Sequence, residues 1–365
     1  MEEVEWGEYK IKELFDSVTG DFDIQKRHIN NSGEFVVTAG LTDNGVLGKS
    51  DVEARVIDAN TITIDMFGNS FYRQFKYKLV THARVFALIP KFKMSEKQGL
   101  FIVNSFKTLP TMFGYENMCS WTKIKDRLIK LPIKDNQIDF DFMDTFIAEL
   151  EAERIAELEA YLKVSGLDNY ELSDEELKAL RDYDSMEWRE YRIGSLFSRI
   201  STKKLPYKAK NLPTEALDDY ELPCLTSSFR NQGLNYYVPR EGATILKDVI
   251  SIPSNSDVYR AYFQSREFTV LSDAYAIKWT DEDRNLSNYQ YLFMVRAINK
   301  VTDLPIYSYK MKLGGWNVVK DKKILLPVID DEIAFNFMED YARAISKLAI
   351  KDVVQYTNER IETTK

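Results

Sequence analysis

Few residues in this chain can support redox or metal chemistry. Its 365 residues include two cysteines and two histidines, and the cysteines lie too far apart in the sequence for a zinc motif. Cys119 and Cys224 are each expected to be an isolated buried thiol, which suits a reducing cytoplasm. His28 and His82 could form a metal site only by gathering scattered ligands, so no metal site is expected.

The sequence also lacks signals for export and for catalysis. It has no N-terminal charged and then apolar segment, and no apolar run near the roughly eighteen residues of a membrane helix, so a cytoplasmic location is expected. Gly-x-Gly-x-x-Gly, Asn-Pro-Pro-Tyr and a nucleophile elbow are absent from it. Residues 43–50 resemble a phosphate loop, but Asp43 replaces the required glycine and would repel phosphate. A catalytic function of its own is therefore not expected.

The chain contains instead an internal repeat. A Glu-Trp-x-Glu-Tyr-(Lys/Arg)-Ile segment at Glu5–Ile11 recurs 182 positions later at Glu187–Ile193, followed each time by Leu-Phe. A Leu-Pro-(Ile/Val) segment that leads through Ile-x-Phe to Met recurs 195 positions later, at Leu131–Met143 and Leu326–Met338. Since the first segment opens each half and the second segment closes it, the sequence predicts two similar domains.

Short β-rich runs between these segments form a common pattern in both halves. Each half also has a segment with helical periodicity, Gln98–Phe106 in the first and Tyr289–Asn299 in the second. The fold class predicted for each half is a compact α+β domain. The strands predicted within the halves are Phe35–Thr38, Thr61–Ile64 and Val80–Leu88, and Pro223–Thr226, Val249–Ile252 and Val270–Trp279.

A long helix is predicted after each Leu-Pro segment, where Pro132 is expected to end a strand. The first helix, over Asp139–Lys163, would be about 37 Å long. Apolar residues in the second helix follow the 3, 4, 3 spacing of a coiled coil, so the two helices are expected to pair. The residues predicted for helix pairing or subunit docking are Phe142, Phe146, Ile147, Leu150, Ile155, Leu158, Leu162, Met338, Tyr341, Ile345 and Leu348.

The charge distribution separates the helices from the domains. The net charge of −8 is concentrated in residues 137–186, which carry −11, and in residues 329–365, which carry −3. Residues 1–136 carry +1 and residues 187–328 carry +5. The sequence thus predicts two domains, an acidic central helix with a linker, and a C-terminal helix over these same ranges. A capping box at Ser173–Glu176 predicts a short helix in the linker.

The loops of the two domains supply candidate contacts to DNA. Arg, Lys, Asn and Gln are the side chains that pair with base edges, and lysine clusters suit phosphate. The candidates are Asn44, Lys49, Asn69, Tyr72, Arg73, Lys203, Lys204, Lys208, Lys210, Arg230, Asn231, Gln232, Asn255, Tyr259 and Arg260. Tyr72 and Tyr259 are expected to pack against their own loops rather than to stack on DNA.

The repeated opening and closing motifs resemble the specificity subunits of type I restriction-modification systems. The run Phe140–Leu162, with Phe-Ile-Ala-Glu-Leu-Glu, resembles the type IIB specificity subunits more closely. The resemblance implies two target-recognition domains held apart by two antiparallel helices, with each domain reading one half of a bipartite site in double-stranded DNA. One departure is the acidic segment Asp168–Asp184, which leaves the length of the spacer open.

The resemblance also implies the partners and cofactors. The expected partners are methyltransferase (modification) subunits, possibly fused to an endonuclease, and no membrane. No cofactor is expected on this chain, while S-adenosylmethionine and Mg²⁺ are expected in the partner subunits. Two alternatives stay open from the residues alone: a scaffold that binds proteins rather than DNA, and a self-contained nuclease or methyltransferase, which the missing motifs disfavour.

Overall fold

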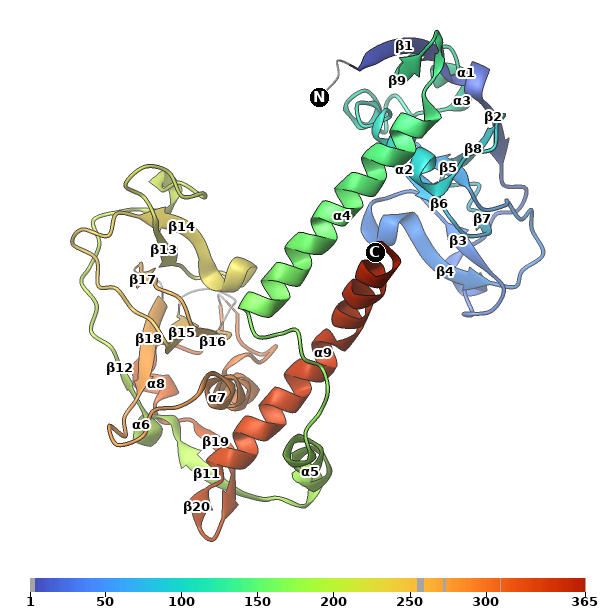
Figure 1. Cartoon of the computed structure of the whole chain (residues 1–365). Helices are drawn as coiled ribbons and strands as arrows, with labels where there is room; N and C mark the ends of the chain where they lie inside the picture. Colours follow the sequence, from blue (N-terminus) through green and yellow to red (C-terminus); the bar gives the residue numbers. More distant parts are fainter. Residues whose placement is uncertain (1–3, 255–258, 272–273, 309, 365) are drawn as a thin grey trace. The chain divides into compact units, whose positions relative to one another are not determined.

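The computed structural model describes residues 4–254, 259–271, 274–308 and 310–364. The chain divides into two compact units, each described separately below (Figure 1). The first unit comprises Met1–Tyr161 with Glu359–Lys365, and the second comprises Leu162–Asn358.

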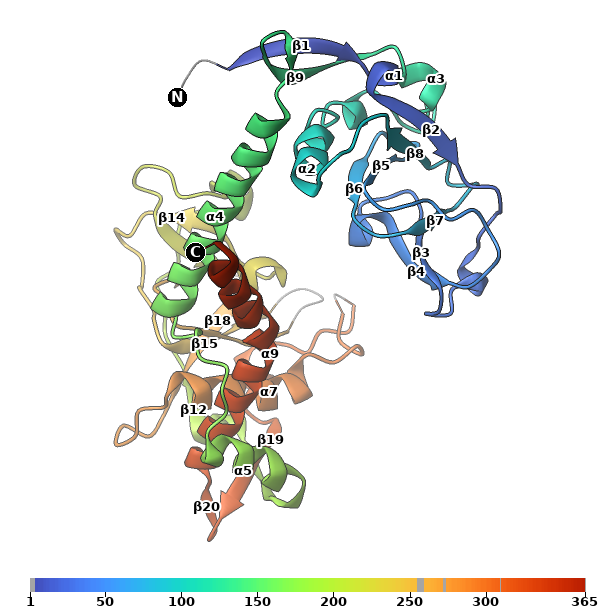
Figure 2. The ribbon, with the colours of Figure 1, turned by 45° about the vertical axis from the view of Figure 1, so that its right-hand side comes forward.

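The described residues of the first unit form three small sheets. Their strand orders are β1-β9-β10, β2-β8-β5-β6 and β4-β3-β7. The strands are β1 (Glu5–Lys10), β2 (Phe15–Thr19), β3 (Glu34–Val37), β4 (Val46–Ser50), β5 (Thr61–Ile64), β6 (Ser70–Arg73), β7 (Tyr77–Leu79), β8 (Phe86–Pro90), β9 (Leu128–Lys134) and β10 (Gln137–Ile138). The helices are α1 (Ile11–Leu14), α2 (Glu96–Asn104), α3 (Trp121–Ile124) and α4 (Phe140–Val164), with 3-10 turns η1 (Lys26–His28), η2 (Thr42–Gly45) and η3 (Leu109–Thr111). Helix α2 packs on β5 and β6 (Figure 2).

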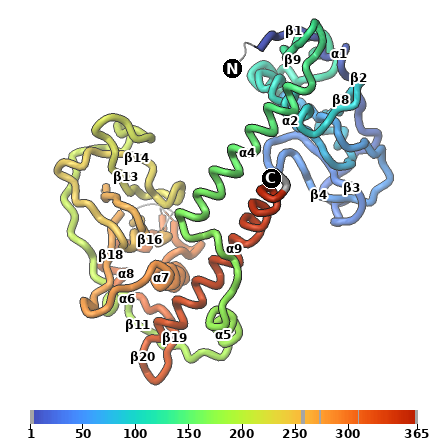
Figure 3. The backbone as a smooth tube through the Cα atoms, in the orientation of Figure 1, coloured from blue at the N-terminus to red at the C-terminus, as the bar shows by residue number. Residues whose placement is uncertain are grey.

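The second unit repeats this topology sheet for sheet. Its strand orders are β11-β19-β20, β12-β18-β15-β16 and β14-β13-β17. The strands are β11 (Glu187–Arg192), β12 (Phe197–Arg199), β13 (Leu222–Leu225), β14 (Leu234–Val238), β15 (Val249–Pro253), β16 (Tyr262–Gln264), β17 (Thr269–Val270), β18 (Ala274–Trp279), β19 (Lys323–Ile329) and β20 (Glu332–Ile333). The helices are α5 (Asp174–Asp182), α6 (Ile193–Leu196), α7 (Asn288–Thr302), α8 (Trp316–Val319) and α9 (Phe335–Thr364), with 3-10 turns η4 (Tyr183–Ser185), η5 (Ala209–Asn211) and η6 (Arg230–Gly233). Helix α7 packs along β19 and β16 (Figure 3).

The predicted elements are largely present, with four differences. The predicted strand Val270–Trp279 is divided between β17 and β18, which belong to different sheets. Residues 80–85 form a turn between β7 and β8 rather than the start of one strand. Strand β6 lies in a segment that was expected to be a loop, because it completes the sheet beside β5. Pro132 lies inside β9 and does not end it. Its carbonyl accepts from Asp139 N on the side away from β1, so the proline nitrogen also faces away from β1 and no hydrogen bond to β1 is lost.

Matching residues form the main core of each unit. In the first unit, Phe15, Ile62 and Met143 are fully buried together. In the second, Phe197, Ile250 and Met338 occupy the equivalent places. Met338, expected on the helix-pairing seam, therefore lies in the core of its domain. The first turn of each long helix belongs to the domain that precedes it.

A duplicated hydrogen-bonded clamp joins each long helix to the shorter helix of its own domain. Asp144 of α4 accepts from Ser95 Oγ at 2.5 Å and from Gln98 Nε2 at 2.6 Å. In the second unit, Glu339 of α9 accepts from Gln290 Nε2 at 3.1 Å. Ser95 and Gln98 form a capping box at the start of α2, so the carboxylate of α4 binds the side chains that begin that helix.

We expect Asp144→Ala to destabilise the first unit by about 1–3 kcal/mol. The substitution removes two hydrogen bonds to a charged acceptor and leaves Gln98, which is 8% exposed, without that partner. Urea unfolding of the full chain, followed by tryptophan fluorescence, measures the loss. Glu149→Ala is the matched control, because Glu149 is an exposed carboxylate on the same helix. Equal effects of the two substitutions would contradict a specific role for the clamp.

Both cysteines are buried free thiols in the structure. Burial raises the pKa of Cys119 and of Cys224 to about 12 in each case. At pH 8 only a minute fraction of either thiol is ionised, so we expect little reaction of the native chain with a thiol reagent and rapid reaction of both in denaturant. A native chain that reacts as fast as the denatured one would contradict this prediction.

Candidate DNA interface

The hairpin of β3 and β4 ends in an exposed turn, η2. Asp43 (φ 48°, ψ 36°) and Asn44 (φ 52°, ψ 32°) both adopt the left-handed conformation, as in a type I′ hairpin turn. The turn closes on Gly45, whose φ of +75° and whose approach to Thr38 O leave no room for a side chain. A β-bulge lies between Val36 and Val37 in the same hairpin. Residues 46–50 form a strand where a phosphate loop would require a helix, so the resemblance of residues 43–50 to that motif has no structural counterpart.

The hairpin of β13 and β14 has the same tip in the second unit. Asn231 (φ 44°, ψ 42°) and Gln232 (φ 54°, ψ 24°) take the two left-handed positions, and Gly233 follows with φ +86°. Each such conformation costs a non-glycine residue about 1–2 kcal/mol. Both tips are thus held in a costly backbone geometry at matching places, which is typical of functional loops.

A buried side chain braces the tip in the first unit. Arg73 is 2% exposed; its Nε donates to Thr63 Oγ1 at 2.9 Å and its guanidinium donates to Asn44 O at 2.7 Å. Burial lowers the pKa of Arg73 to about 10, so the group stays charged at neutral pH. Arg73, which the sequence suggested as a DNA contact, supports the tip from inside the domain.

The second unit has the same brace built from a different side chain. Gln264, which is 4% exposed, donates from Nε2 to Ser251 Oγ at 3.0 Å and to Gln232 O at 3.4 Å. Gln264 pairs with Val249 across the sheet as Arg73 pairs with Thr61, so the two braces are structurally equivalent. Sequence reasoning missed Gln264. The offset of 188 that links Thr63 to Ser251 was the available signal.

The remaining first-half candidates make contacts within their own domain. Asn69 donates to Asp65 from both its backbone and its side chain. Tyr72 Oη donates to Asn60, and its ring lies against Gly99, where a Cβ would approach it to 2.3 Å. Lys49 is partly buried with Nζ 4.7 Å from the centre of the Phe35 ring. Asn44 at the tip is exposed.

In the second half, the structure brings three candidates together at the hairpin tip: Arg230, Asn231 and Gln232 are consecutive and exposed. Tyr259 is 1% exposed, as expected for a packed residue, and Arg260 pairs with Asp303 at 2.7 Å. Asn255 lies outside the described residues.

The lysine candidates lie on one basic segment of the second unit. Residues 191–214 contain no Asp or Glu, and Lys203, Lys204, Lys208 and Lys210 within them are exposed. Leu205 and Leu212 anchor the segment, since each is 8% exposed and packs in a small core. The lysines therefore project from a fixed loop.

Each unit also carries an aromatic surface where its long helix meets its shorter helix. In the first unit, Trp6 stacks on Phe101 at 6.4 Å and Phe101 meets Phe146 edge-on at 5.7 Å. Trp6 is 52% exposed and Phe146 is 45% exposed. These rings, with the exposed Leu100 and Leu150, define the first apolar face.

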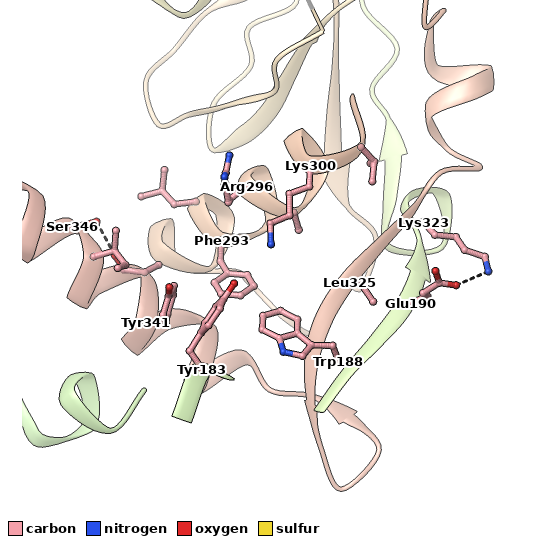
Figure 4. Close-up of a pocket in the computed structure, with 15 residues that line it drawn as sticks. Tyr183, Trp188, Glu190, Phe293, Arg296, Lys300, Lys323, Leu325, Tyr341 and Ser346 are labelled. Atoms are coloured by element: carbon pink, nitrogen blue, oxygen red, sulfur yellow. Dashed lines mark hydrogen bonds and ion pairs between the residues drawn. The ribbon is translucent and has the colours of Figure 1, made fainter. Parts of the chain in front are cut away.

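The second unit repeats this face. Trp188 stacks on Phe293 at 6.3 Å, and Phe293 meets Tyr341 at 6.0 Å. These rings line a pocket of about 700 Å³ with Arg296 and Lys300 at its rim (Figure 4). Exposed Leu292 and Ile345 correspond to Leu100 and Leu150, so these residues define the second apolar face.

Helix α5 and the turn η4 of the linker cover one side of the second apolar face. Tyr183 stacks on Tyr341 at 4.5 Å. Glu176 is 1% exposed and pairs with Lys347 of α9 at 2.9 Å, so the acidic linker is docked on its own unit. The predicted capping box of this helix is present, with Ser173 Oγ accepting from Glu176 N.

The remaining helix candidates differ in exposure. Leu162 is 3% exposed, whereas Leu348 is 47% exposed. Phe142, Ile147, Ile155 and Leu158 are partly buried.

Comparison with known proteins finds similarity to restriction-modification specificity subunits. Residues 3–160 match the model of the type I restriction modification DNA specificity domain. The chain is also 24% identical over 342 residues to the type II restriction enzyme specificity subunit S.BcgI of Heyndrickxia coagulans, covering 93% of this chain and 94% of that protein. Residues 3–160 therefore carry the type I DNA specificity domain, and the chain over nearly its whole length is similar to a specificity subunit. Specificity subunits are the non-catalytic members of their complexes.

The fold agrees with that assignment. The crystal structure of the type I restriction-modification S subunit from M. genitalium matches with a TM-score of 0.62 and 15% identity, covering 100% of this chain and 94% of that one. Within the described ranges, no helix of the chain is long and apolar enough to span a membrane. Among those same residues, no cluster of His, Cys, Asp or Glu is placed to hold a metal ion.

Proposed function

We propose that each domain of this specificity subunit reads one half of a bipartite DNA site, and that the two braced hairpin tips carry the reading side chains. The observation that supports this most is the duplication of tip and brace, with different polar residues in the two copies. The first tip presents Thr42, Asp43 and Asn44, and the second presents Arg230, Asn231 and Gln232. Each set offers base-edge donors or acceptors, and a change of side chains on a constant frame gives two different half-site sequences.

The lysines of residues 203–210 would contact phosphate near the second half-site. They lie on an anchored loop of the domain with the larger positive charge, +5 for residues 187–328. Such contacts position a protein on DNA and add affinity without adding sequence preference.

The long helices would pair antiparallel and set the distance between the half-sites. At about 1.5 Å per residue, the 25 residues of α4 span roughly 37 Å, close to one turn of duplex DNA. Two domains carried at such a separation could reach successive major-groove faces on one side of the duplex. The clamps at Asp144 and Glu339 would transmit this spacing, because they fix each domain to its helix.

The two apolar faces would dock methyltransferase subunits, which bind S-adenosylmethionine and, in a restriction complex, Mg²⁺. An exposed cluster of aromatic and aliphatic side chains is typical of a protein interface. Its occurrence in both units, with aromatic rings at matching positions, fits two copies of one partner. The pocket beside Trp188 would receive an apolar side chain of that partner, and Arg296 and Lys300 would favour acidic residues next to it.

The decisive test uses the complex of this chain with its methyltransferase subunits. Its affinity is measured at rising salt for two duplexes, one that contains the recognition site and one that does not. Sites are first mapped by sequencing methylated DNA from cells that express the complex. We expect preference for the mapped site and a linear fall of log affinity with log salt. Equal binding of both duplexes, or affinity that does not depend on salt, would contradict the proposal.

A single tip residue should affect one half-site. Arg230→Ala is expected to weaken binding by about 1–3 kcal/mol and to relax specificity in the second half-site alone, because one base-edge contact is lost. Arg266→Ala is the matched control, since Arg266 is an exposed arginine of the same unit outside the tip. Competition binding with single-base variants of the site measures both effects. Relaxation in both half-sites would argue against a separate reader in each domain.

A further inference from the structure

The two hairpin tips share an exposed apolar residue that hydrogen-bonding chemistry does not explain. Leu41 precedes the first turn and is 70% exposed, while Phe229 precedes the second and is 62% exposed. Their positions differ by the same offset of 188 that relates the flanking strands. Their backbones also agree, with φ −94° and ψ −22° for Leu41 and φ −94° and ψ −16° for Phe229.

The two tips differ in their polar residues but share an apolar residue and a glycine. All three polar residues after the apolar one differ between the copies, as a change of recognised bases requires. The large apolar side chain and the closing glycine occur in both. A single exposed apolar residue on a surface needs no explanation, but two at the same place on two otherwise different tips indicate a task that does not depend on DNA sequence.

The braces make both tips rigid enough for such a task. Arg73 holds Asn44 O in the first unit, and Gln264 holds Gln232 O in the second. Tyr262 Oη also donates to the carbonyl of Phe229 at 3.4 Å, so the apolar residue itself is tied to the sheet. Separating stacked base pairs costs a few kcal/mol. A side chain that does this needs a backbone that is held in place, as the hydrogen bonds at each tip hold it.

We propose that Leu41 and Phe229 are apolar wedges, each inserting at one base step of its half-site and kinking the duplex there. Leucine and phenylalanine are both among the side chains that proteins use for this purpose. Insertion also places the polar residues of the tip against the neighbouring base edges. This inference rests on the proposed function, since it requires each tip to face DNA.

The test measures DNA bending by the complete complex with its methyltransferase subunits. Energy transfer between dyes at the two ends of a duplex carrying the mapped site reports the bend angle, without S-adenosylmethionine. The variants are Leu41→Ala, Phe229→Ala and the double substitution. Leu41→Met keeps a wedge side chain, and Leu217→Ala is the control, because Leu217 is also 62% exposed but lies outside the tip.

We expect each alanine variant to remove at least about 20° of bend, the lower limit for a wedge, and to weaken specific binding about tenfold. Leu41→Met and Leu217→Ala should bend the duplex as the unsubstituted complex does. Reactivity of thymines to permanganate, which detects unstacking, should fall only in the half-site whose wedge is removed.

The outcomes of this test distinguish failure of the wedges from failure of half-site reading. Specific binding with the same bend in all variants would overturn the wedges and leave the reading of half-sites in place. Equal binding of the mapped and a scrambled duplex by the unsubstituted complex would overturn both proposals. A bend lost equally with Leu217→Ala would show a general loss of contact and would also overturn the wedges.

Discussion

Replacing residues 187–328 with the corresponding segment of another family member is expected to change one half of the recognised DNA site and to preserve the other. Methylation of the original site should fall by at least about 1000-fold, since each mismatched base pair costs about 1–3 kcal/mol and a half-site contains several. The structure supports these exchange points, because Glu187 and Val328 are direct partners in the pairing of β11 with β19. Sequencing of methylated DNA from cells that express the chimera measures the outcome.

The junction with α9 decides whether the chimera folds. Met338 lies in the core of the exchanged domain and Glu339 accepts from Gln290, so the donor segment must supply an apolar pocket and a matching donor. The control for the cloning steps is the chimera in which the donor segment has been replaced again by the original residues 187–328. If both half-sites change, recognition is shared between the domains and the proposed division of labour fails.

Shortening both long helices by seven residues, two turns each, is expected to change the permitted spacing and leave both half-site sequences intact. Seven residues correspond to about 10 Å of helix, the length of roughly three base pairs. At the original spacing the domains could no longer reach both half-sites, so we expect methylation there to fall by about 100-fold or more. A library of sites with every spacer length, selected by methylation, identifies the new optimum.

The matched control keeps the length and changes the sequence. Replacing the same seven residues in each helix by helix-forming alanine and glutamate should retain the original spacer if length alone sets it. The deletions must lie beyond the clamps and must spare Lys347, which pairs with the buried Glu176. Altered half-site letters with the old spacer would contradict the proposal that the helices set the spacing.

Only some elements of the two halves were predictable from the sequence. The β-rich runs correctly predicted β5 and β15, and the apolar periodicity correctly predicted α4 and α9. Strand β6 was missed, because its four residues are polar or aromatic and their pairing with β5 is not a local property. The extent of β9 was also missed, since a proline is tolerated wherever its nitrogen faces away from the paired strand.

The direction of individual side chains was the least predictable feature of the candidate interface. Arg73 and Asn44 both appeared as polar loop residues with similar chemistry, yet Arg73 is buried and holds the carbonyl of Asn44. An arginine can be buried when hydrogen bonds satisfy it, and those partners come from Thr63 and from the hairpin tip. The pairing of Gln264 with Ser251 is hidden for the same reason.

The sequence by itself determined that this protein is a duplication, that acidic helices follow its domains, and that it resembles the specificity subunits of restriction-modification systems. Those features depend on residue order, periodicity and charge, which are properties of the chain alone. Only the tertiary structure decided which polar residues face outward on the tips and which brace them from within, and that Met338 belongs to a domain core. Burial is set by the elements that pack around a residue, and those elements come from distant parts of the chain.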